Sequence, residues 1–321
     1  MPMSYGFCIA CIIKAMAKIY EKAYMGDEIV SIDKASLNIT SSAVLYGLSV
    51  YTVFPVLVID GEKKIFRLQA HYERLIKSAK IIGIDTFEKD WDYKKFEEAV
   101  FLLVKANDIT ERVFVRATVH VDAEVAGTIS RGLSTLLSMF VYEGTSILPK
   151  NGARIKTSVW RRIPDYAIPS RAKVNGAYIN SVLGKQDAID SGYDDCLFLD
   201  VSGHVCELSA ANIFIVRDGV LSTPHAEHDI LEGINRKTIL ELAKDMDIPT
   251  SEHTIDLTEL YIADEIFACG TSAFVTPILE VDARVVGNGE IGTITSNIKK
   301  MYEKLMKGDS DEHEDLLTSV V

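Results

Sequence analysis

The fold class is decided by two neighbouring stretches, DCLFLDVSGHVCEL (195–208) and NIFIVRDGVLSTP (212–224). Each contains two runs of apolar and β-branched residues, separated by Ser-Gly in the first stretch and by Asp-Gly in the second. Short turns of this kind join antiparallel strands, so each stretch predicts a β-hairpin. Because strands that come in hairpins do not alternate strictly with helices, the sequence predicts an α+β fold rather than a doubly wound parallel sheet.

Hydrophobic periodicity places further elements on both sides of these hairpins. We expect a hairpin over 49–68 leading into a helix over 70–84, a helix over 94–108, strands over 112–122 and 134–144, and helices over 234–248 and 295–308. The Pro, Asn and Gly of the stretch 148–154 suit a linker. The predicted organisation is therefore a small α+β domain over 19–147, this linker, and a large α+β domain over 155–321.

Residues 1–18 are expected to be an N-terminal extension of uncertain status. Its GFCIACIIK stretch contains a C-x-x-C pair, Cys8 and Cys11, but no second ligand pair is visible for a metal. The apolar run is too short to span a bilayer and lacks the basic region of a secretory signal. We expect residues 1–15 to lie outside the fold and to reflect an upstream start.

Charge and cysteine usage limit the partners and the compartment. The formal net charge of −12 argues against a nucleic-acid surface or a polybasic membrane patch, so a small-molecule partner is expected. The chain has five cysteines, an odd number scattered along 321 residues, which do not form a disulfide framework. A reducing compartment, the cytoplasm, is the expected location.

Two motifs invite functional interpretations that the sequence does not support. GNGEIG (287–292) fits the dinucleotide fingerprint G-x-G-x-x-G, but too few residues follow it for the rest of that motif, so it is interpreted as a turn. His225 and His228 could face each other as metal ligands, but a solvated loop is the better interpretation of PHAEHD. No metal site is predicted, and Cys269 is expected to be a buried small hydrophobe.

Several stretches, in their order and spacing, carry a resemblance to a known family. They are YG (46–47), IFRLQAHYERLIKSAK (65–80), IPSRAKVNGAYINS (168–181), GYDDCLFLDVSGHVCELSAANIFIVRDGVLSTP (192–224), ILEGINRKTILELA (230–243) and LYIADEIFACGTSAFVTPI (260–278). Over about residues 19–321 the chain resembles the class IV pyridoxal-phosphate aminotransferases, and within them it is most similar to branched-chain amino acid aminotransferases. The resemblance implies a two-domain α+β fold with pyridoxal 5'-phosphate between the domains, and a homodimer whose active sites borrow residues across the interface.

The resemblance assigns three residues to the pyridine ring of the cofactor and the groups attached to it. Lys173 matches the lysine that forms the Schiff base and shuttles a proton, which requires an amine that is neutral at working pH. Glu207 matches the carboxylate that faces the pyridine nitrogen and keeps it protonated. Tyr178 matches the tyrosine hydrogen-bonded to the phenolic oxygen of the cofactor.

A second group of residues matches the phosphate site of the family. Arg74 corresponds to the phosphate-binding arginine, whose planar fork suits a dianion. The backbone N–H groups of Ile234 and Asn235 open a helix, which is a natural anion site. Thr271 adds a hydroxyl, although Asn235 stands where the family usually has threonine, so one hydroxyl contact is missing.

The implied substrate pocket departs from the branched-chain pattern. Its expected residues are Tyr46, Tyr51, Val53, Phe114, Arg116, Thr271 and Ser272. In VYTVFPV (50–56), Val53 replaces a pocket-lining glycine and Pro55 replaces an arginine, so the pocket should be smaller. Phe114 replaces a tyrosine that often helps to hold the substrate carboxylate, whereas Arg116 is retained.

The resemblance implies a ping-pong transamination of leucine, isoleucine and valine with 2-oxoglutarate, a reaction of branched-chain amino acid biosynthesis. Selectivity among these substrates rests on one or two methylenes, so a broad preference is expected. Three alternatives stay open at this point. They are a D-amino acid aminotransferase, an aminodeoxychorismate lyase of the same fold, and a non-catalytic binding homologue.

Overall fold

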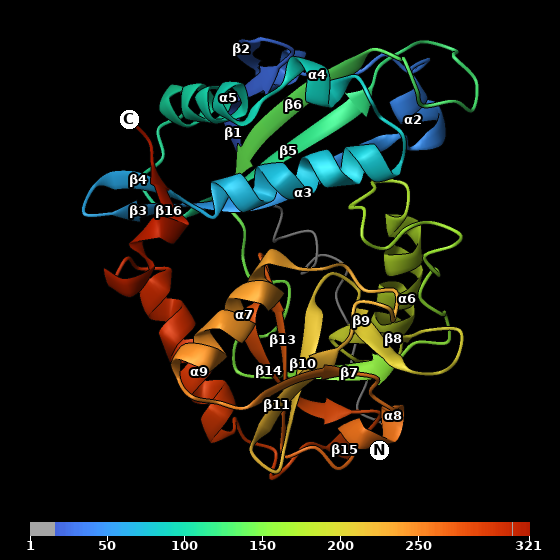
Figure 1. The fold of residues 1–321 in the computed structure, drawn as a ribbon, viewed down its shortest axis with the longest axis vertical. Helices are drawn as coiled ribbons and strands as arrows, with labels where there is room; N and C mark the ends of the chain where they lie inside the picture. Colours follow the sequence, from blue (N-terminus) through green and yellow to red (C-terminus); the bar gives the residue numbers. More distant parts are fainter. Residues whose placement is uncertain (1–16, 310) are drawn as a thin grey trace, which may run out of the picture.

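The computed structural model describes residues 17–309 and 311–321, which fold around two β-sheets (Figure 1). Residues 1–16, and with them Cys8 and Cys11 of the expected extension, lie outside the described residues. The α+β fold class is confirmed, because each sheet contains antiparallel hairpins and is covered by helices. No helix within the described ranges is both long enough and apolar enough to span a bilayer.

The first sheet has seven strands in the order β16-β4-β3-β5-β6-β1-β2. They are β1 (Ile19–Met25), β2 (Glu28–Ser31), β3 (Ser49–Ile59), β4 (Glu62–Phe66), β5 (Val113–Val121), β6 (Thr135–Tyr142) and β16 (Leu317–Ser319). Its helices are η1 (Ile32–Lys34), α2 (Ser42–Tyr46), α3 (Leu68–Ile81), α4 (Phe87–Asp90) and α5 (Tyr93–Ala106). In Figure 1, α3 lies across one face of this sheet.

The second sheet has nine strands in the order β12-β11-β10-β13-β14-β7-β8-β9, with β15 paired to β14. They are β7 (Ala153–Thr157), β8 (Asp195–Leu199), β9 (Val205–Leu208), β10 (Asn212–Arg217), β11 (Val220–Pro224), β12 (Thr250–His253), β13 (Glu265–Gly270), β14 (Phe274–Val281) and β15 (Arg284–Val285). Its helices are α6 (Tyr178–Asp190), α7 (Ile234–Asp245), α8 (Leu257–Leu260), α9 (Thr293–Leu305) and η2 (Asp311–Leu316).

The two stretches that predicted hairpins form them. Strand β8 pairs antiparallel with β9, with Leu197 opposite Leu208. Strand β10 pairs antiparallel with β11, with Ile215 opposite Ser222. These hairpins place the residues after β8 and along β9 at one end of the second sheet, next to the site described below.

Strand β3 divides its side chains between a helix and the interior of the molecule. Phe54 and Thr52 face α3, since the ring of Phe54 lies 5.6 Å from that of His71 and the Thr52 hydroxyl lies 2.7 Å from Nδ1 of His71. Alternate residues of a strand point to opposite faces, so Tyr51 and Val53 point away from the helix. This alternation turns the strand's other face toward the second sheet.

The arrangement of the sheets differs from the predicted domain boundaries in two places. Strand β7 begins at Ala153, inside the expected linker. Strand β16 pairs with β4, with Thr318 opposite Ile65, so the end of the expected large domain completes the first sheet. One hydrophobic cluster also joins the two parts, because the rings of Phe66 and Tyr302 lie 6.5 Å apart.

The G-x-G-x-x-G pattern at 287–292 is a turn before α9, as the sequence predicts. The carboxylate of Glu265 accepts hydrogen bonds from the N–H groups of Ile294 at 3.0 Å and Thr295 at 2.6 Å. An acidic side chain of the protein therefore already satisfies this helix N-terminus, where a dinucleotide site would need to receive a phosphate.

Candidate active site

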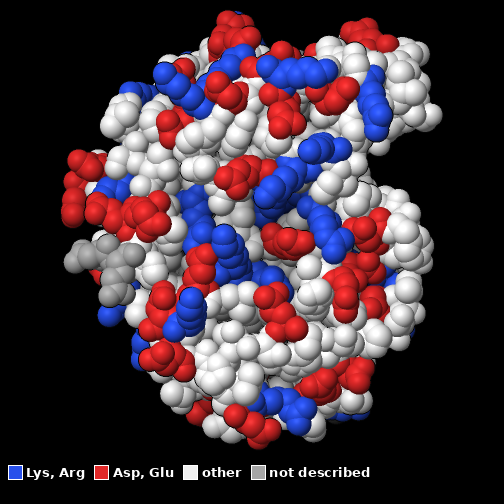
Figure 2. All heavy atoms as spheres, viewed as in Figure 1, with Lys and Arg blue, Asp and Glu red and all other residues white. Residues whose placement is uncertain are grey.

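A cavity with an open mouth lies between the two sheets. All of the predicted site residues except Tyr46 and Phe114 line it: Tyr51, Val53, Arg74, Arg116, Lys173, Tyr178, Glu207, Ile234, Asn235, Thr271 and Ser272. Figure 2 shows Lys and Arg side chains gathered around the hollow in the middle of one face, although the chain is acidic overall. The cavity therefore suits an anionic ligand.

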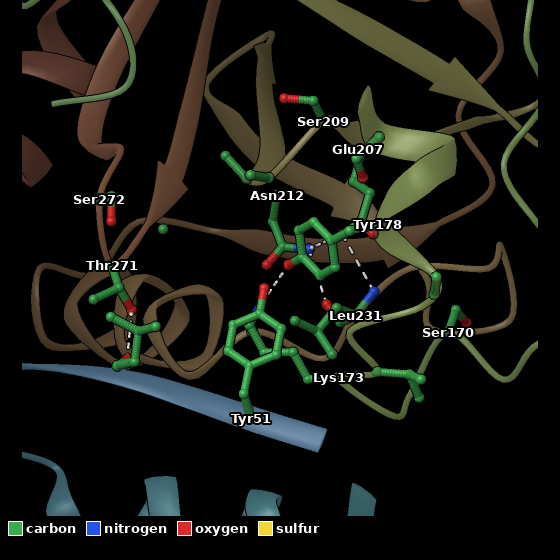
Figure 3. Close-up of a pocket in the computed structure, with 18 of the residues that line it drawn as sticks. Tyr51, Ser170, Lys173, Tyr178, Glu207, Ser209, Asn212, Leu231, Thr271 and Ser272 are labelled. Carbon is green, nitrogen blue, oxygen red and sulfur yellow. Dashed lines mark hydrogen bonds between the residues drawn. The ribbon is translucent and has the colours of Figure 1, made fainter. Parts of the chain in front are cut away.

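Lys173 is held by backbone contacts with the first sheet and its helix. Its N–H donates to the hydroxyl of Ser78 on α3 at 3.1 Å, and its carbonyl accepts from the N–H of Tyr51 on β3 at 3.0 Å. The side chain enters the cavity, where Nζ donates to the Tyr178 hydroxyl at 2.7 Å (Figure 3). Tyr178 is the first residue of α6, so two separate elements meet at this contact.

Burial changes the acidity of both groups. It lowers the pKa of the Lys173 amine, and Arg74 adds to this effect while Tyr178 and Glu207 oppose it. Burial alone would raise the pKa of the Tyr178 phenol, but the adjacent Lys173 outweighs it and lowers that pKa. Compared with water, the site thus favours the neutral form of the Lys173 amine and makes the Tyr178 phenol more acidic.

Glu207 lies on β9 and is fixed through both carboxylate oxygens. Oε1 lies 2.7 Å from a guanidinium nitrogen of Arg162, and Oε2 accepts from the Asn212 side chain at 3.0 Å and the Leu231 N–H at 3.2 Å. Burial raises the pKa of Glu207, while Arg162, the Leu231 N–H and Lys173 act to lower it. These partners orient the carboxylate within the cavity wall.

Arg74 and the start of α7 form an anion-binding end of the cavity. Arg74 donates from Nη2 to the Thr52 hydroxyl at 3.1 Å, and its buried Nε has no hydrogen-bond partner among the described residues. Burial lowers its pKa to about 10. The first N–H groups of α7, at Ile234 and Asn235, have no partner within the helix. Both sets of donors suit a phosphate.

The residues expected to contact the substrate surround another part of the cavity. Arg116 donates to the side-chain oxygen of Asn175 at 2.8 Å, and its guanidinium lies over the Tyr51 ring, 3.6 Å from the centroid. Thr271 donates from its hydroxyl to the carbonyl of Val53 at 3.4 Å. The Thr271 contact ties the turn after β13 to β3.

Tyr46 and Phe114 are not in this wall. Tyr46 lies on α2 and is 48% exposed. Phe114 is fully buried, with its ring 5.7 Å from Tyr142 and 6.2 Å from Phe274. Phe114 therefore packs outside the cavity wall, next to Tyr142, which does line the cavity.

The comparisons with known proteins agree with this geometry. The family model for amino-transferase class IV matches residues 49–281. This range includes Lys173, Glu207 and all the residues that line the cavity, from Tyr51 to Ser272. The chain belongs to the class IV aminotransferases. The predicted family and enzyme class are thereby confirmed.

Relatives of this class IV aminotransferase match it along nearly the whole chain. A branched-chain-amino-acid aminotransferase from Pseudomonas aeruginosa is 36% identical, covering 91% of this chain and 95% of its own. The solved structure of a branched-chain aminotransferase from Thermoproteus uzoniensis with norvaline is 33% identical, with a TM-score of 0.89 and coverage of 94% and 100%.

A further solved structure of this class holds a cofactor derivative. The T.th. branched-chain amino acid aminotransferase, complexed with N-(5'-phosphopyridoxyl)-L-glutamate, is 31% identical, with a TM-score of 0.87 and coverage of 94% and 99%. The cavity of the present aminotransferase fits the expected cofactor of its family. It offers a buried amine, a fixed carboxylate, and at the phosphate end a buried Arg74 Nε without a partner among the described residues.

Several wall residues escaped the sequence analysis, among them Arg162, Asn212 and Ser170. Arg162 and Asn212, the side-chain partners of Glu207, carry no local motif that distinguishes them from other polar residues. Ser170, whose buried hydroxyl has no partner among the described residues, lies in the same IPSRAKV stretch as Lys173. Only the position of Ser170 next to the candidate lysine could have marked it.

Proposed function

We propose that this enzyme transfers the amino group of the branched-chain L-amino acids leucine, isoleucine and valine to 2-oxoglutarate, with pyridoxal 5'-phosphate as cofactor. The observation that carries the proposal is the buried amine of Lys173 in one cavity with the fixed carboxylate of Glu207. The names of the relatives support the branched-chain substrates, and the glutamate derivative held by the T.th. enzyme supports the acceptor.

In this proposal, Lys173 would hold the cofactor covalently. Glu207 would face its pyridine nitrogen, and the Tyr178 hydroxyl would donate a hydrogen bond to its phenolic oxygen. Arg74, the N–H groups of Ile234 and Asn235 at the start of α7, and the hydroxyl of Thr271 would bind its phosphate.

The bound cofactor supplies an electron sink for the charge that develops when the substrate loses its α-proton. Lys173 accepts this proton, because burial favours the neutral, basic form of its amine. The same amine then gives the proton back later in the amino transfer. The cation of Arg162, 2.7 Å from Glu207, fixes the carboxylate and would hold it in position for the pyridine nitrogen.

Substrate binding follows from the remaining wall residues. We propose that Arg116 and the donors of the Thr271–Ser272 turn hold the carboxylate of the substrate, while Tyr51 and Val53 contact its side chain. A valine at position 53 limits the width of this part, and one methylene in such a pocket changes binding by about 1 to 3 kcal/mol. The donor and the acceptor use the same site in turn, which is a ping-pong order.

The test is a half-reaction of the purified holoenzyme with single amino donors. Leucine, isoleucine and valine should each convert the visible absorbance of the bound cofactor, and D-alanine should not. Lys173→Ala should abolish both the covalent retention of the cofactor and the conversion. Conversion by D-alanine alone, or release of pyruvate from aminodeoxychorismate, would replace this proposal with one of the other activities of the fold.

We also propose a homodimer in the cytoplasm. One face of α6 exposes Ile179, Val182 and Leu183, and Trp160 and Tyr166, in the segment between β7 and α6, are exposed as well. An apolar surface of this kind is typical of a protein interface. Light scattering at micromolar concentration should give the mass of two chains, and Val182→Glu should give one; a single-chain mass for the unaltered protein would contradict the proposal.

A further inference from the structure

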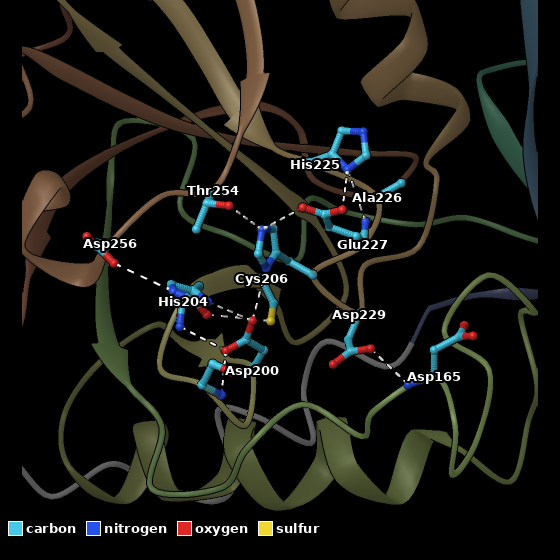
Figure 4. A network of polar contacts seen from close by, with 12 residues as sticks. Asp165, Asp200, His204, Cys206, His225, Ala226, Glu227, Asp229, Thr254 and Asp256 are labelled. Carbon is cyan, nitrogen blue, oxygen red and sulfur yellow. Dashed lines mark hydrogen bonds and ion pairs between the residues drawn. The ribbon is translucent and has the colours of Figure 1, made fainter.

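A second cluster of polar side chains lies next to the hairpin that carries Glu207, outside the cavity (Figure 4). It consists of Asp200 after β8, His204 in the β8–β9 turn and His228 in the segment before α7. One potential ligand atom of each residue lies within 4.8 Å of the others. The side chains of Asp200 and His228 are 9% and 8% exposed, whereas that of His204 is 33% exposed.

The turn presents the carboxylate of Asp200 in one orientation. Its Oδ1 accepts from the N–H groups of Ser202 at 2.8 Å and His204 at 2.9 Å. Its Oδ2 lies 3.2 Å from Nδ1 of His204 and 3.0 Å from Nδ1 of His228. One carboxylate oxygen therefore holds the turn together, and the other lies between two ring nitrogens.

The outer nitrogen of His228 has an oxygen partner, because Nε2 lies 2.8 Å from the hydroxyl of Thr254. With the proton on Nε2, the neutral ring of His228 turns the lone pair of Nδ1 toward Asp200. An oxygen acceptor behind a histidine ligand fixes this tautomer in many metal sites. Nε2 of His204 lies 4.0 Å from a carboxylate oxygen of Asp256, too far for a hydrogen bond.

We propose that Asp200, His204 and His228 bind a first-row divalent transition-metal ion such as Zn²⁺. Nδ1 of each histidine and Oδ2 of the aspartate are the ligands. Two imidazoles and one carboxylate suit Zn²⁺ better than Mg²⁺ or Ca²⁺, which prefer oxygen ligands alone. Water completes the coordination, since His204 is open to solvent.

Metal binding displaces any proton on Nδ1 of each histidine, either to Nε2 of the same ring or to solvent.

This site differs from the histidine pair that the sequence suggested. His225 turns toward Glu227, with Nδ1 3.6 Å from the carboxylate, and it is half exposed. His228 is buried and faces the β8–β9 turn, so PHAEHD is only partly a solvated loop, and its metal-binding partners come from a hairpin 24 to 28 residues earlier.

The metal would clamp the β8–β9 turn to the segment before α7. In that segment the carbonyl of Asp229 accepts from Nε of Arg162 at 3.2 Å, and Arg162 also pairs with Glu207. The clamp therefore lies next to the support of a cavity residue but contributes no atom to the cavity. Its expected effect is on stability.

The test uses the full chain with bound cofactor, freed of excess cofactor and of metal, in a Cys8→Ser and Cys11→Ser background that removes the competing C-x-x-C thiols. Calorimetric titration with Zn²⁺ and the visible absorption of Co²⁺ should each give one ion per chain. Saturating Zn²⁺ should raise the melting temperature by several degrees. His204→Ala should weaken binding at least tenfold and remove the thermal shift, whereas His225→Ala should leave both unchanged.

Asp200→Asn is the second variant, because an amide oxygen can still accept from the turn. It should also weaken binding at least tenfold, with circular dichroism and cofactor absorbance like those of the unaltered protein. Equal Zn²⁺ affinity in the unaltered chain and in either variant, or no binding at all, would overturn the proposal.

Discussion

Glu207 and Arg162 form a largely buried ion pair, with side chains 7% and 16% exposed. Replacing one partner leaves the other charge buried without a counter-charge. This loss lowers the free energy of unfolding by more than the intact pair contributes to it. The carboxylate thus has a structural and a proposed chemical role. A pair of substitutions can separate the two.

Glu207→Gln should lower the free energy of unfolding by about 3 kcal/mol, because Arg162 loses its counter-charge. It should lower kcat/KM about 100-fold, equivalent to about 2.7 kcal/mol. Adding Arg162→Met should recover stability in urea unfolding without recovering activity. Recovery of both together would show that the carboxylate acts only on the fold.

His120 gives the fold a dependence on pH. Burial, with Arg116 nearby, lowers the pKa of His120 to about 4. Between the ordinary pKa of about 6.5 and this value, the unfolded chain binds a proton that the folded chain does not, so stability falls as the pH falls through this window. From pH 7 to pH 5 the expected loss is about 1 to 2 kcal/mol.

Urea unfolding at pH 7 and pH 5 tests this dependence. His120→Gln can keep a hydrogen bond to Ser138, which lies 2.8 Å from the imidazole, and should reduce the loss of stability on acidification. The half-exposed His225→Gln is the matched control and should behave like the unaltered chain. An unchanged pH dependence in His120→Gln would exclude His120 as its source.

At the residue scale, the sequence predicted the site residues that lie in a recognisable motif. It missed those that belong to the site only because the fold brings them there. Lys173 and Glu207 lie in recognisable stretches, and both line the cavity. Arg162 is one of two adjacent arginines, and nothing in RRIPDY tells which one turns inward toward Glu207. The substitution of Phe114 for tyrosine signalled a change, but the packing that fills its place could not be derived from the chain alone.

The close packing at the start of α7 requires a glycine. A Cβ atom on Gly233 would lie 2.1 Å from the side-chain oxygen of Asn212, the residue that donates to Glu207. The backbone of Gly233 is extended with φ of −67°, so the requirement is space and not conformation. The start of the helix is thus packed directly against Asn212, the residue that also holds the carboxylate on β9.

Gly233→Ala should therefore weaken cofactor binding at least about tenfold, since it displaces Asn212 and the first N–H groups of α7 together. The dissociation constant of pyridoxal 5'-phosphate from the apoenzyme measures this. Lys237→Ala, at an exposed position one turn later, is the matched control and should have little effect. Equal affinity in Gly233→Ala would mean that the helix end can shift without loss of the phosphate contacts.

Most long periodic elements were predicted, but α6 was not. Its buried residues are polar or small, among them Asn180, Ser181 and Gly184, while Ile179 and Val182 are exposed. The apolar stripe that usually identifies a helix thus points away from the core of its own chain. Gly184 is required for close packing, because its Cβ would lie 2.5 Å from the ring of Phe198. The sequence alone does not indicate which part of the molecule packs against each face of α6.

At the scale of the whole molecule, the two sheets share hydrophobic packing. Leu57 and Phe66 of the first sheet belong to one cluster with Phe214 and Phe267 of the second and with Tyr302 of α9. The predicted small and large domains therefore have a common core between them. Such packing couples their unfolding.

Single-tryptophan variants can measure this coupling. Trp91 is buried in the core of the first sheet, and Trp160 lies in the segment after β7. In urea, the fluorescence of Trp91 in Trp160→Phe and that of Trp160 in Trp91→Phe should report transitions with the same midpoint, after correction for each variant's stability by circular dichroism. Separate midpoints would mean that the two domains unfold independently.

Strand β16 has a consequence for how the chain is made. Its partner β4 emerges from the ribosome early, whereas Leu317–Ser319 are translated roughly 250 residues later. During that interval the backbone of β4 has one unpaired edge, which another nascent chain can join. Glu62, Lys63 and Lys64, on β4, are charged residues that can discourage such contacts until synthesis reaches the closing strand.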